Sequence, residues 1–379
     1  MDALVSAASL SRPSMDRPRS YPSGERPRLS VVIVNYLHWE DTARLVGQLR
    51  ASAAVRDGTA EIIVVDNHSP GHPLISWLRR IGGVTLRRWK ANLGFARAVN
   101  EACRLSNGDW TLLLNPDTSV APGFLDELLA RLDLLSDHVG IVGFQLQNDD
   151  GSRQHSTGPD PSFVGTLARL LLPRRFRKYD LQHSEHPAQV DWVTGCGLLV
   201  RRTCYLDVGG LDDSFFLYYE DADLCRRARL AGWSVWFDPT LALVHHRPLH
   251  DRAVPPHLRL ITRHALLTYA SKYWSSWQVA ILAGIVRCEA LVRTGLAQLR
   301  GQQWHQQIFV ELGRLAAEIH QDNPEAARAR LLRVIQRLET HRVPTAVDCH
   351  SVPQSSRSAT AVPGQHPAPC QQSPSAPGR

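Results

Sequence analysis

The chain has 379 residues, of which 43% are hydrophobic and 21% are charged, and its formal net charge is +7. That length holds one large domain or two moderate ones, and the composition is that of a globular protein. A basic excess without a compact nucleic-acid-binding motif argues against a nucleic-acid-binding protein. It fits an anionic ligand or an anionic membrane surface instead.

Targeting features are scarce in the sequence. Its start lacks the basic, apolar and small-residue regions of a signal peptide. The chain also has no uninterrupted apolar run of about 18 residues, the length that spans a membrane. The seven cysteines show no C-x-x-C pair and no zinc-ligand spacing, which is typical of a reducing cytosol. We therefore predict a cytoplasmic protein, peripheral at most to the inner face of the cell membrane.

The two ends of the chain differ in composition from its centre. Residues 1–28 are rich in Pro, Ser and Arg, and residues 341–379 in Pro, Ser and Gln. Such segments cannot bury enough apolar surface to order themselves. We predict a disordered arm (1–28), an α/β domain (29–256), a helical C-terminal extension (257–340) and a disordered tail (341–379).

Strand and helix patterns alternate in the first half. Continuous apolar runs predict buried strands at residues 29–36, 61–67 and 110–117, with a weaker strand at 84–89. Helical patterns cover residues 39–53 and 94–106. This alternation predicts βαβ units and a mostly parallel, Rossmann-like sheet flanked by helices.

Polar side chains follow these strands at Asp66, Asn67, Asn115 and Asp117. Ligands of open α/β sheets bind beyond the carboxyl ends of the strands. Each acid alone is as readily explained by an Asx turn, but two strand-end acids together favour a ligand site. A carboxylate that faces a diphosphate repels it unless a divalent cation lies between them, so we predict Mg²⁺ or Mn²⁺ at Asp117.

A helix begins after Asn92-Leu93-Gly94-Phe95, between the two acids. Backbone N–H groups at a helix N-terminus favour phosphate, and Gly94 would let the backbone approach a ligand closely. No G-x-G-x-x-G or G-x-x-x-x-G-K-[ST] motif occurs. Their absence argues against a Rossmann dehydrogenase and a P-loop NTPase.

The second half begins with a His-, Pro- and Arg-rich stretch at residues 151–189, which predicts a variable connection with one short helix at 163–172. Its basic cluster fits an anionic acceptor, a membrane or a solvated face equally well (Arg174, Arg175, Arg177, Lys178). Further on, Gly195 and Gly197 fit either a close backbone approach to a ligand or a bulged strand with Cys196 buried.

Strands are predicted at residues 233–239 and 241–246, and helices at 257–338. His245 and His246 point to opposite faces of an extended strand, so one of them can face the site. Apolar stripes at 281–286, 312–319 and 331–338 predict helices packed on the domain. Trp274 and Trp277, with arginines nearby, leave a helix at a membrane interface as the alternative.

Three acids, Glu220, Asp221 and Asp223, follow the aromatic run at residues 215–219. Carboxylates on a partly desolvated wall raise one another's pKa, which suits a general base near neutral pH or a cation-binding group. The alternative is a helix N-terminus whose acids complement the helix dipole.

Five segments, in this order, resemble family 2 glycosyltransferases, most closely their rhamnosyltransferase-like branch. They are Val31–Tyr36 (VVIVNY), Val64–Asn67 (VVDN), Asn92–Asn100 (NLGFARAVN), Leu113–Asp117 (LLNPD) and Phe216–Arg226 (FLYYEDADLCR). The resemblance runs from about residue 29 to residue 263. It implies a GT-A fold, a nucleotide-sugar donor, a divalent metal and inversion at the anomeric carbon.

The resemblance also implies roles for individual residues. Asp221 would be the general base, with Glu220 and Asp223 beside it, and Asp117 would bind the metal together with His245, with His246 as the alternative. Asp66 would contact the base or ribose of the donor. The remaining expected donor-binding residues are Asn35, Asn67, Asn92, Gly94, Phe95, Asn115 and Gly195. Asn115 stands where many relatives have an Asp, and Ala98 where a Gly is frequent.

We therefore predict an inverting, metal-dependent glycosyltransferase. It would move a sugar, with rhamnose as the candidate, from a nucleotide-diphosphate donor to a glycan or lipid-linked saccharide in polysaccharide biosynthesis. A sugar nucleotidyltransferase is less well matched, because a Gly-rich basic loop does not follow the first strand. A non-catalytic glycan-binding scaffold is the other alternative, and the presence of both Asp117 and Asp221 argues against it.

Overall fold

The structure is a computed structural model, which describes residues 26–171, 185–247 and 254–341. Residues 1–25 of the predicted arm, the basic cluster Arg174, Arg175, Arg177 and Lys178, and the predicted tail from residue 342 lie outside the described residues. The five cysteines within them are free thiols (Cys103, Cys196, Cys204, Cys225, Cys288).

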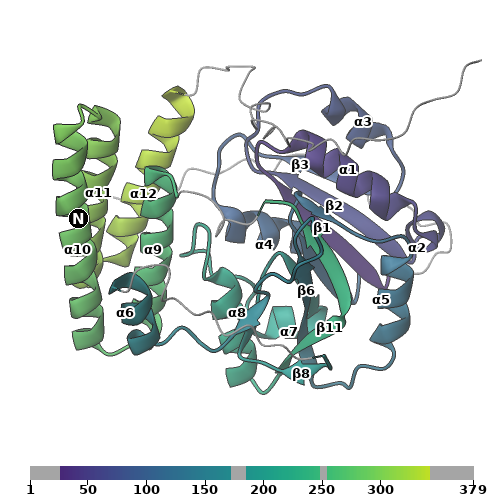
Figure 1. Ribbon diagram of the computed structural model, residues 1–379. Coiled ribbons are helices and arrows are strands. Elements are labelled where there is room, and N and C mark those ends of the chain that lie inside the picture. Colours follow the sequence, from purple (N-terminus) through teal and green to yellow (C-terminus); the bar gives the residue numbers. More distant parts are fainter. Residues whose placement is uncertain (1–25, 172–184, 248–253, 342–379) are drawn as a thin grey trace, which may run out of the picture. The chain divides into compact units, whose positions relative to one another are not determined.

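In the described part of the chain, nine strands form one sheet with the order β3-β2-β1-β4-β10-β6-β11-β5, and β8 pairs with β11 (Figure 1). The parallel set is β1 (Leu29–Asn35), β2 (Ala60–Asp66), β3 (Val84–Arg88), β4 (Trp110–Leu114), β6 (Val139–Gln147) and β11 (Ser234–His245). Antiparallel to it run β5 (Thr118–Ser119), β8 (Ala188–Gln189) and β10 (Gly197–Arg201). Two short strands, β7 (Thr157–Gly158) and β9 (Trp192–Val193), pair separately. The predicted α/β class with a mostly parallel sheet is confirmed.

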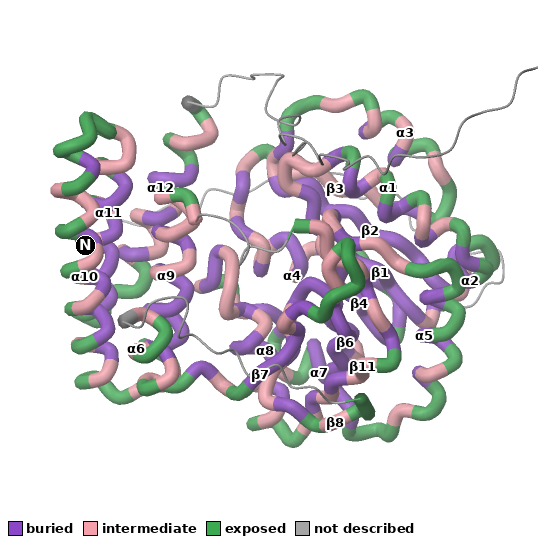
Figure 2. The backbone as a smooth tube through the Cα atoms, viewed as in Figure 1, coloured by how far each residue is buried: buried purple, intermediate pink, exposed green. Residues whose placement is uncertain are grey.

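Helices cover both faces of this sheet, as continuously apolar strands require. Alternate residues of β1 point to opposite sides, so Val31 and Ile33 join one core while Val32 and Val34 join the other. The first core includes α1 (Trp39–Arg50), α2 (Ala53–Asp57), α3 (Leu74–Arg80) and α5 (Phe124–Leu132). The second includes α4 (Phe95–Leu105), α7 (Arg202–Asp207) and α8 (Glu220–Leu230). Figure 2 shows the buried strands between these layers.

The predicted helical extension is confirmed as α9 (Pro256–Tyr273), α10 (Ser276–Leu299), α11 (Gln303–His320) and α12 (Pro324–His341). The short helix α6 (Phe163–Leu171) lies beside it, with the Phe163 ring against Trp274 and Trp277. The predicted domain boundary coincides with the start of α9, although the division into two domains stays a prediction. Among the described helices, none is long and apolar enough to cross a membrane.

Two of the three predicted apolar stripes are buried as expected, those of α11 and α12. The prediction that the whole stripe at residues 281–286 packs on the domain was partly wrong. Leu282 and Val286 of α10 are buried, but Ile281 faces outward. The segments predicted as separate strands at 233–239 and 241–246 form the single strand β11, with an irregularity between Asp238 and Ala242. We did not predict α3, α5 or the central strand β6.

Candidate active site

The ends of β1 and β2 hold a buried polar network. Asn35 and Asp66 are fully buried, and the Asn35 amide donates to Asp66 Oδ1 at 2.8 Å and to Ser69 Oγ at 3.1 Å. Asp66 Oδ2 accepts from Arg88 Nε at 2.9 Å. These contacts are internal, so Asn35 fixes the orientation of Asp66. The donor-contact role expected of both residues stays a prediction.

A second amide network fixes the start of α4. Asn67 Nδ2 donates to Asn92 Oδ1 at 2.8 Å, while Asn67 Oδ1 accepts from the Leu93 backbone N–H at 3.0 Å. Asn92 Oδ1 also accepts from the Gly94 N–H at 3.1 Å, and the Phe95 N–H donates to the Phe216 carbonyl at 2.6 Å. We expected the backbone N–H groups at this helix start to be free for a phosphate. This is wrong for Gly94 and Phe95, because both N–H groups donate hydrogen bonds within the protein.

Gly94 is needed here for backbone packing. Its φ is +97°, a conformation that disfavours side chains, and an added Cβ would lie 2.7 Å from the Phe216 carbonyl oxygen. The close approach places the aromatic run before α8 against the start of α4. Gly94 therefore positions the segment that leads into the three acids.

We expect Gly94→Ala to lower the free energy of unfolding by about 1–3 kcal/mol, because a strained φ and a backbone clash act together. Urea unfolding followed by circular dichroism measures this. Gly47→Ala, within α1 and with no atom within 4 Å of the new methyl group, is the matched control. It should stabilise by about 0.5–1 kcal/mol. Equal effects of both changes would contradict the packing role of Gly94.

Asp117 and His245 face each other where β4 and β11 end. His245 Nε2 lies 3.6 Å from Asp117 Oδ1, and His245 Nδ1 contacts Gln154 Oε1 at 2.9 Å. An amide oxygen accepts only from a protonated Nδ1, so the Gln154 contact leaves Nε2 as the ring nitrogen that faces Asp117. Burial opposes ionisation of Asp117, but the hydrogen bond and charge of His245 and the charge of His38 lower its pKa.

This donor set fits a divalent cation. A carboxylate oxygen and an imidazole nitrogen suit Mn²⁺, Mg²⁺ favours oxygen ligands, and the Gln154 contact is the kind that orients a metal-binding histidine. No cluster of three or more His, Cys, Asp or Glu side chains suited to a metal occurs among the described residues. The remaining ligands would therefore come from substrate oxygens and water.

The geometry separates the two histidine candidates. His246 Nε2 contacts Ser119 Oγ at 2.7 Å, and its Nδ1 contacts Asp149. His246 thus points away from Asp117, as alternation along an extended strand requires. Asn115 lies in the turn after β4, where its backbone carbonyl accepts from Thr118 and its N–H donates to the Cys196 carbonyl at 3.4 Å.

Asp221, in the first turn of α8, is half-buried beside the loop between β9 and β10. Its Oδ2 accepts from the Gly195 N–H at 2.9 Å, and its Oδ1 from the Ala222 N–H at 2.8 Å. Burial raises the pKa of Asp221, and the two backbone N–H groups only partly offset this. A carboxylate with a raised pKa is a better proton acceptor.

The loop at Gly195 and Cys196 joins the two acidic groups. Gly195 bonds to Asp221, while the carbonyl of Cys196 bonds to Asn115, two residues before Asp117. The charges of both Asp117 and Asp221 add to burial in raising the pKa of the Cys196 thiol, so both acids lie near it. Gly195 therefore positions Asp221 through its backbone N–H. At position 197 close packing requires a glycine, since an added Cβ would lie 2.4 Å from the Leu243 side chain.

Glu220 differs from Asp221 in having no polar contact at one oxygen. Its side chain is buried, and Oε2 has no hydrogen-bond partner among the described residues. Burial first, and then the charge of Asp221, raises the pKa of Glu220 well above its usual range. The raised pKa favours the neutral form of Glu220, which limits its charge repulsion on Asp221.

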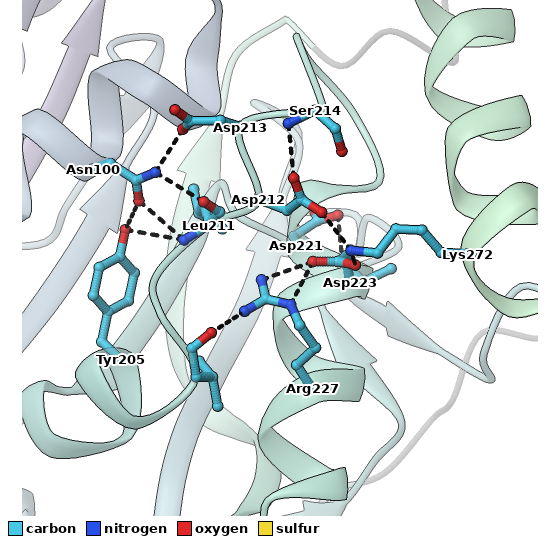
Figure 3. Close-up of polar contacts among 12 residues, drawn as sticks. Asn100, Tyr205, Leu211, Asp212, Asp213, Ser214, Asp221, Asp223, Arg227 and Lys272 are labelled. Atoms are coloured by element: carbon cyan, nitrogen blue, oxygen red, sulfur yellow. Dashed lines mark hydrogen bonds and ion pairs between the residues drawn. The ribbon is translucent and has the colours of Figure 1, made fainter. Parts of the chain in front are cut away.

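Asp223 joins α8 to α9 through its contact with Lys272 (Figure 3). It is fully buried, accepts from Arg227 Nε at 2.7 Å and Tyr273 Oη at 2.7 Å, and pairs with Lys272. Lys272 also reaches Asp212, at 2.5 Å. The expected place of Asp223 beside the base is thus corrected, since its oxygens are used in a structural network.

Several residues near the strand ends have strained backbones. Leu37 follows β1, His68 follows β2, and Tyr218 and Tyr219 precede α8, all with φ between 65° and 74°. Such conformations cost about 1–3 kcal/mol each for residues other than glycine and cluster at functional sites. Their gathering at this edge of the sheet supports its assignment as the active site.

Sequence reasoning missed Gln154, Arg88 and Lys272. Gln154 lies in the variable connection and carries no local signal, and Lys272 lies 49 positions after its partner Asp223. Arg88 had a usable signal, because parallel register places it opposite Asp66. Basic residues opposite a strand-end acid are natural candidates for orienting it.

The carboxyl edge of the sheet thus holds an Asp–His pair and a second carboxylate, Asp221, an arrangement suited to binding and acting on a ligand of an open α/β sheet. The family is settled by sequence, because the model for "Glycosyltransferase like family 2" matches residues 27–274. The chain belongs to this family and is a glycosyltransferase. The predicted family is confirmed.

Curated relatives agree with this assignment. Over 289 residues the chain is 29% identical to the N-acetylglucosaminyl-diphospho-decaprenol L-rhamnosyltransferase of Mycobacterium tuberculosis H37Rv, covering 71% of this chain and 92% of that protein. It is 27% identical to rhamnosyltransferase WbbL of Escherichia coli K12, covering 59% and 85%. Among solved structures, a mannosyltransferase from Pyrobaculum calidifontis in complex with GDP-Man and Mn²⁺ matches with a TM-score of 0.44 and 16% identity, over 88% of this chain and 92% of that one.

Proposed function

We propose that the protein is an inverting, metal-dependent glycosyltransferase that moves rhamnose from a nucleoside-diphosphate donor to a glycan or lipid-linked saccharide. Its setting would be polysaccharide biosynthesis of the cell envelope, in the cytoplasm or at the inner face of the membrane. Family membership supports the donor class, and the names of the relatives support the sugar. The observation that carries the proposal is the Asp117–His245 pair linked through Gly195 and Cys196 to Asp221.

In this reaction the acceptor hydroxyl oxygen bonds to the anomeric carbon while the bond from that carbon to the diphosphate breaks. Asp221 takes the hydroxyl proton, a role suited to its raised pKa. Inversion needs no enzyme nucleophile, so the buried Cys196 thiol has no chemical part. Asp117 and His245 would hold Mg²⁺ or Mn²⁺, which supplies Lewis-acid stabilisation of the diphosphate when bound.

Turnover separates this proposal from its alternatives. A glycosyltransferase releases a nucleoside diphosphate from a nucleotide sugar, and Mn²⁺ should increase that release. A nucleotidyltransferase would exchange pyrophosphate instead, and a non-catalytic scaffold would bind without turnover. A thermal-shift panel of nucleotide sugars identifies the donor first, because a ligand that binds only the folded state raises the melting temperature. Stabilisation by a nucleotide sugar other than nucleoside diphosphate-rhamnose would contradict the choice of sugar.

We expect Asp117→Asn to abolish the metal dependence of donor binding. The change keeps the side-chain shape but removes the negative charge that a cation requires. Isothermal titration with the nucleotide sugar, with and without Mn²⁺, measures this. His245→Gln should weaken the Mn²⁺ effect and His246→Gln should not, because only His245 faces Asp117. Unchanged Mn²⁺-dependent affinity in Asp117→Asn would overturn the metal assignment.

A further inference from the structure

Helix α10 has exposed positions along its length (Figure 2), and many of them hold large apolar side chains. Leu291 and Leu299 are 72% and 86% exposed. The exposed apolar side chains of the stripe are Trp277, Ile281, Leu291, Val292, Leu296 and Leu299. At 100° per residue they fall within an arc of about 140°, and at 1.5 Å per residue the stripe is about 33 Å long. Scattered exposed apolar residues are ordinary, but a continuous stripe of this length marks an interaction surface.

The opposite side of α10 is apolar as well. Val279, Leu282, Val286 and Ala290 are buried in the core formed with α9 and α11. Helix α10 therefore has two apolar faces with charged residues between them, and apolar faces of a helix are normally covered. The bundle formed with α9 and α11 covers one of these faces. We therefore expect another surface to cover the outward stripe.

The charges around the stripe are basic. On a helical projection, exposed Arg287 borders one edge of the stripe and exposed Arg300 the other. The single acid of α10, Glu289, is enclosed by arginines, with contacts of 3.0 Å to Arg259, 2.7 Å to Arg263 and 3.0 Å to Arg293. The face is thus apolar along its centre and positive at its edges, which is complementary to an anionic lipid surface.

A second copy of the chain fits the stripe less well. The stripe runs from Trp277 to Leu299, so its midpoint is Cys288. A two-fold axis through that midpoint would pack two antiparallel copies of α10 and bring the Arg287 side chains of both together. Like charges brought together at the edge of an interface oppose association. Trp277 at one end is instead the residue type that favours the boundary between lipid and water.

We propose that the outward stripe of α10, from Trp277 to Leu299, lies on an anionic membrane surface with Arg287 and Arg300 against the lipid headgroups. The helix lies in the plane of the interface, since none of the described helices is suited to crossing the bilayer. This contact is separate from the chemistry at Asp117 and Asp221, so it is testable without the glycosyl acceptor.

Vesicle co-sedimentation of the full chain tests the proposal. Vesicles of equal parts phosphatidylglycerol and phosphatidylcholine should bind the protein, and pure phosphatidylcholine should bind it more weakly. Leu291→Gln combined with Leu299→Gln should lower the partition coefficient for anionic vesicles by at least about tenfold, because two large apolar side chains leave the contact. Leu134→Gln, at a position 83% exposed and outside α10, should bind as the wild type does.

Two further measurements test whether the double variant is still folded and active. The melting temperature of the double variant and its release of nucleoside diphosphate in solution should match the wild type, because both leucines are exposed and distant in sequence from the acids. Wild-type protein that stays in the supernatant with both vesicle types would overturn the proposal, as would a double variant that binds normally. Sedimentation velocity that shows a wild-type dimer and a monomeric double variant would assign the stripe to a second copy.

Discussion

Asp221→Asn is expected to lower kcat by roughly 10²- to 10⁴-fold, the usual contribution of a positioned acid–base group. Its carboxylate is held at 2.9 Å by the Gly195 N–H, and burial raises its pKa. The amide keeps the shape and can still accept this hydrogen bond, but it does not take a proton. Donor affinity should stay almost unchanged, because only stabilisation of the transition state is lost. Single-turnover kinetics together with donor titration measures the two quantities separately.

Glu220→Gln is the matched control for this prediction. Burial raises the pKa of Glu220 and so favours its neutral form, and glutamine has the shape and charge of that form. The variant should retain most of its turnover. Full activity in Asp221→Asn would assign the base to a residue other than Asp221.

The sign of the pH dependence follows from the same assignment. A base acts in its ionised form, so kcat/KM should fall as the pH drops through the pKa of Asp221. Because burial raises that pKa, the acid limb should lie above the range of an ordinary aspartate. In Glu220→Gln, kcat/KM should fall at nearly the same pH as in the wild type.

Much of the fold was predictable from local pattern. Apolar runs of strand length gave β1, β2 and β4, and the acids at their ends indicated which edge of the sheet carries the site. The strand β6 was missed, although Val139–Gln147 is almost entirely buried and pairs with β10 and β11. Its two glycines, Gly140 and Gly143, obscure the strand pattern, and both are required by packing, since an added Cβ would lie 2.7 Å from Cys204 or 2.4 Å from Val193.

The candidate site was less predictable than the fold, because partners distant in the sequence decide what each side chain does. Asp221 and Asp223 are two residues apart and therefore about 200° apart on a helix, so only one of them can face the strand ends. Sequence spacing does not tell which one. Lys272 and Tyr273 decide it, because both donate from α9 to Asp223 Oδ1, while Arg227 on α8 holds Oδ2. The same holds for Gly94, whose amide is committed to Asn92.

Asp223→Ala is expected to lower the free energy of unfolding by about 3–5 kcal/mol, the usual effect of breaking a buried ion pair from one side. Arg227 and Lys272 would lose the negative charge of Asp223, and the Tyr273 hydroxyl would lose the oxygen that accepts its hydrogen bond. Urea unfolding should therefore show an earlier midpoint, and the contact between α8 and α9 should loosen first. Amide hydrogen exchange in these two helices measures that loosening.

Asp213→Ala is the matched control, because Asp213 lies in the loop before α8 and pairs there with Arg97 at 3.1 Å in an exposed ion pair. A surface pair contributes about 0–1 kcal/mol, so this variant should unfold almost as the wild type does. Arg227→Met in the Asp223→Ala background should recover part of the stability, since it removes a cation whose carboxylate partner was Asp223, whereas Lys272 still pairs with Asp212. The structural assignment of Asp223 fails if Asp223→Ala unfolds at the wild-type urea concentration yet has no turnover, because proton transfer would then belong to Asp223 and not to Asp221.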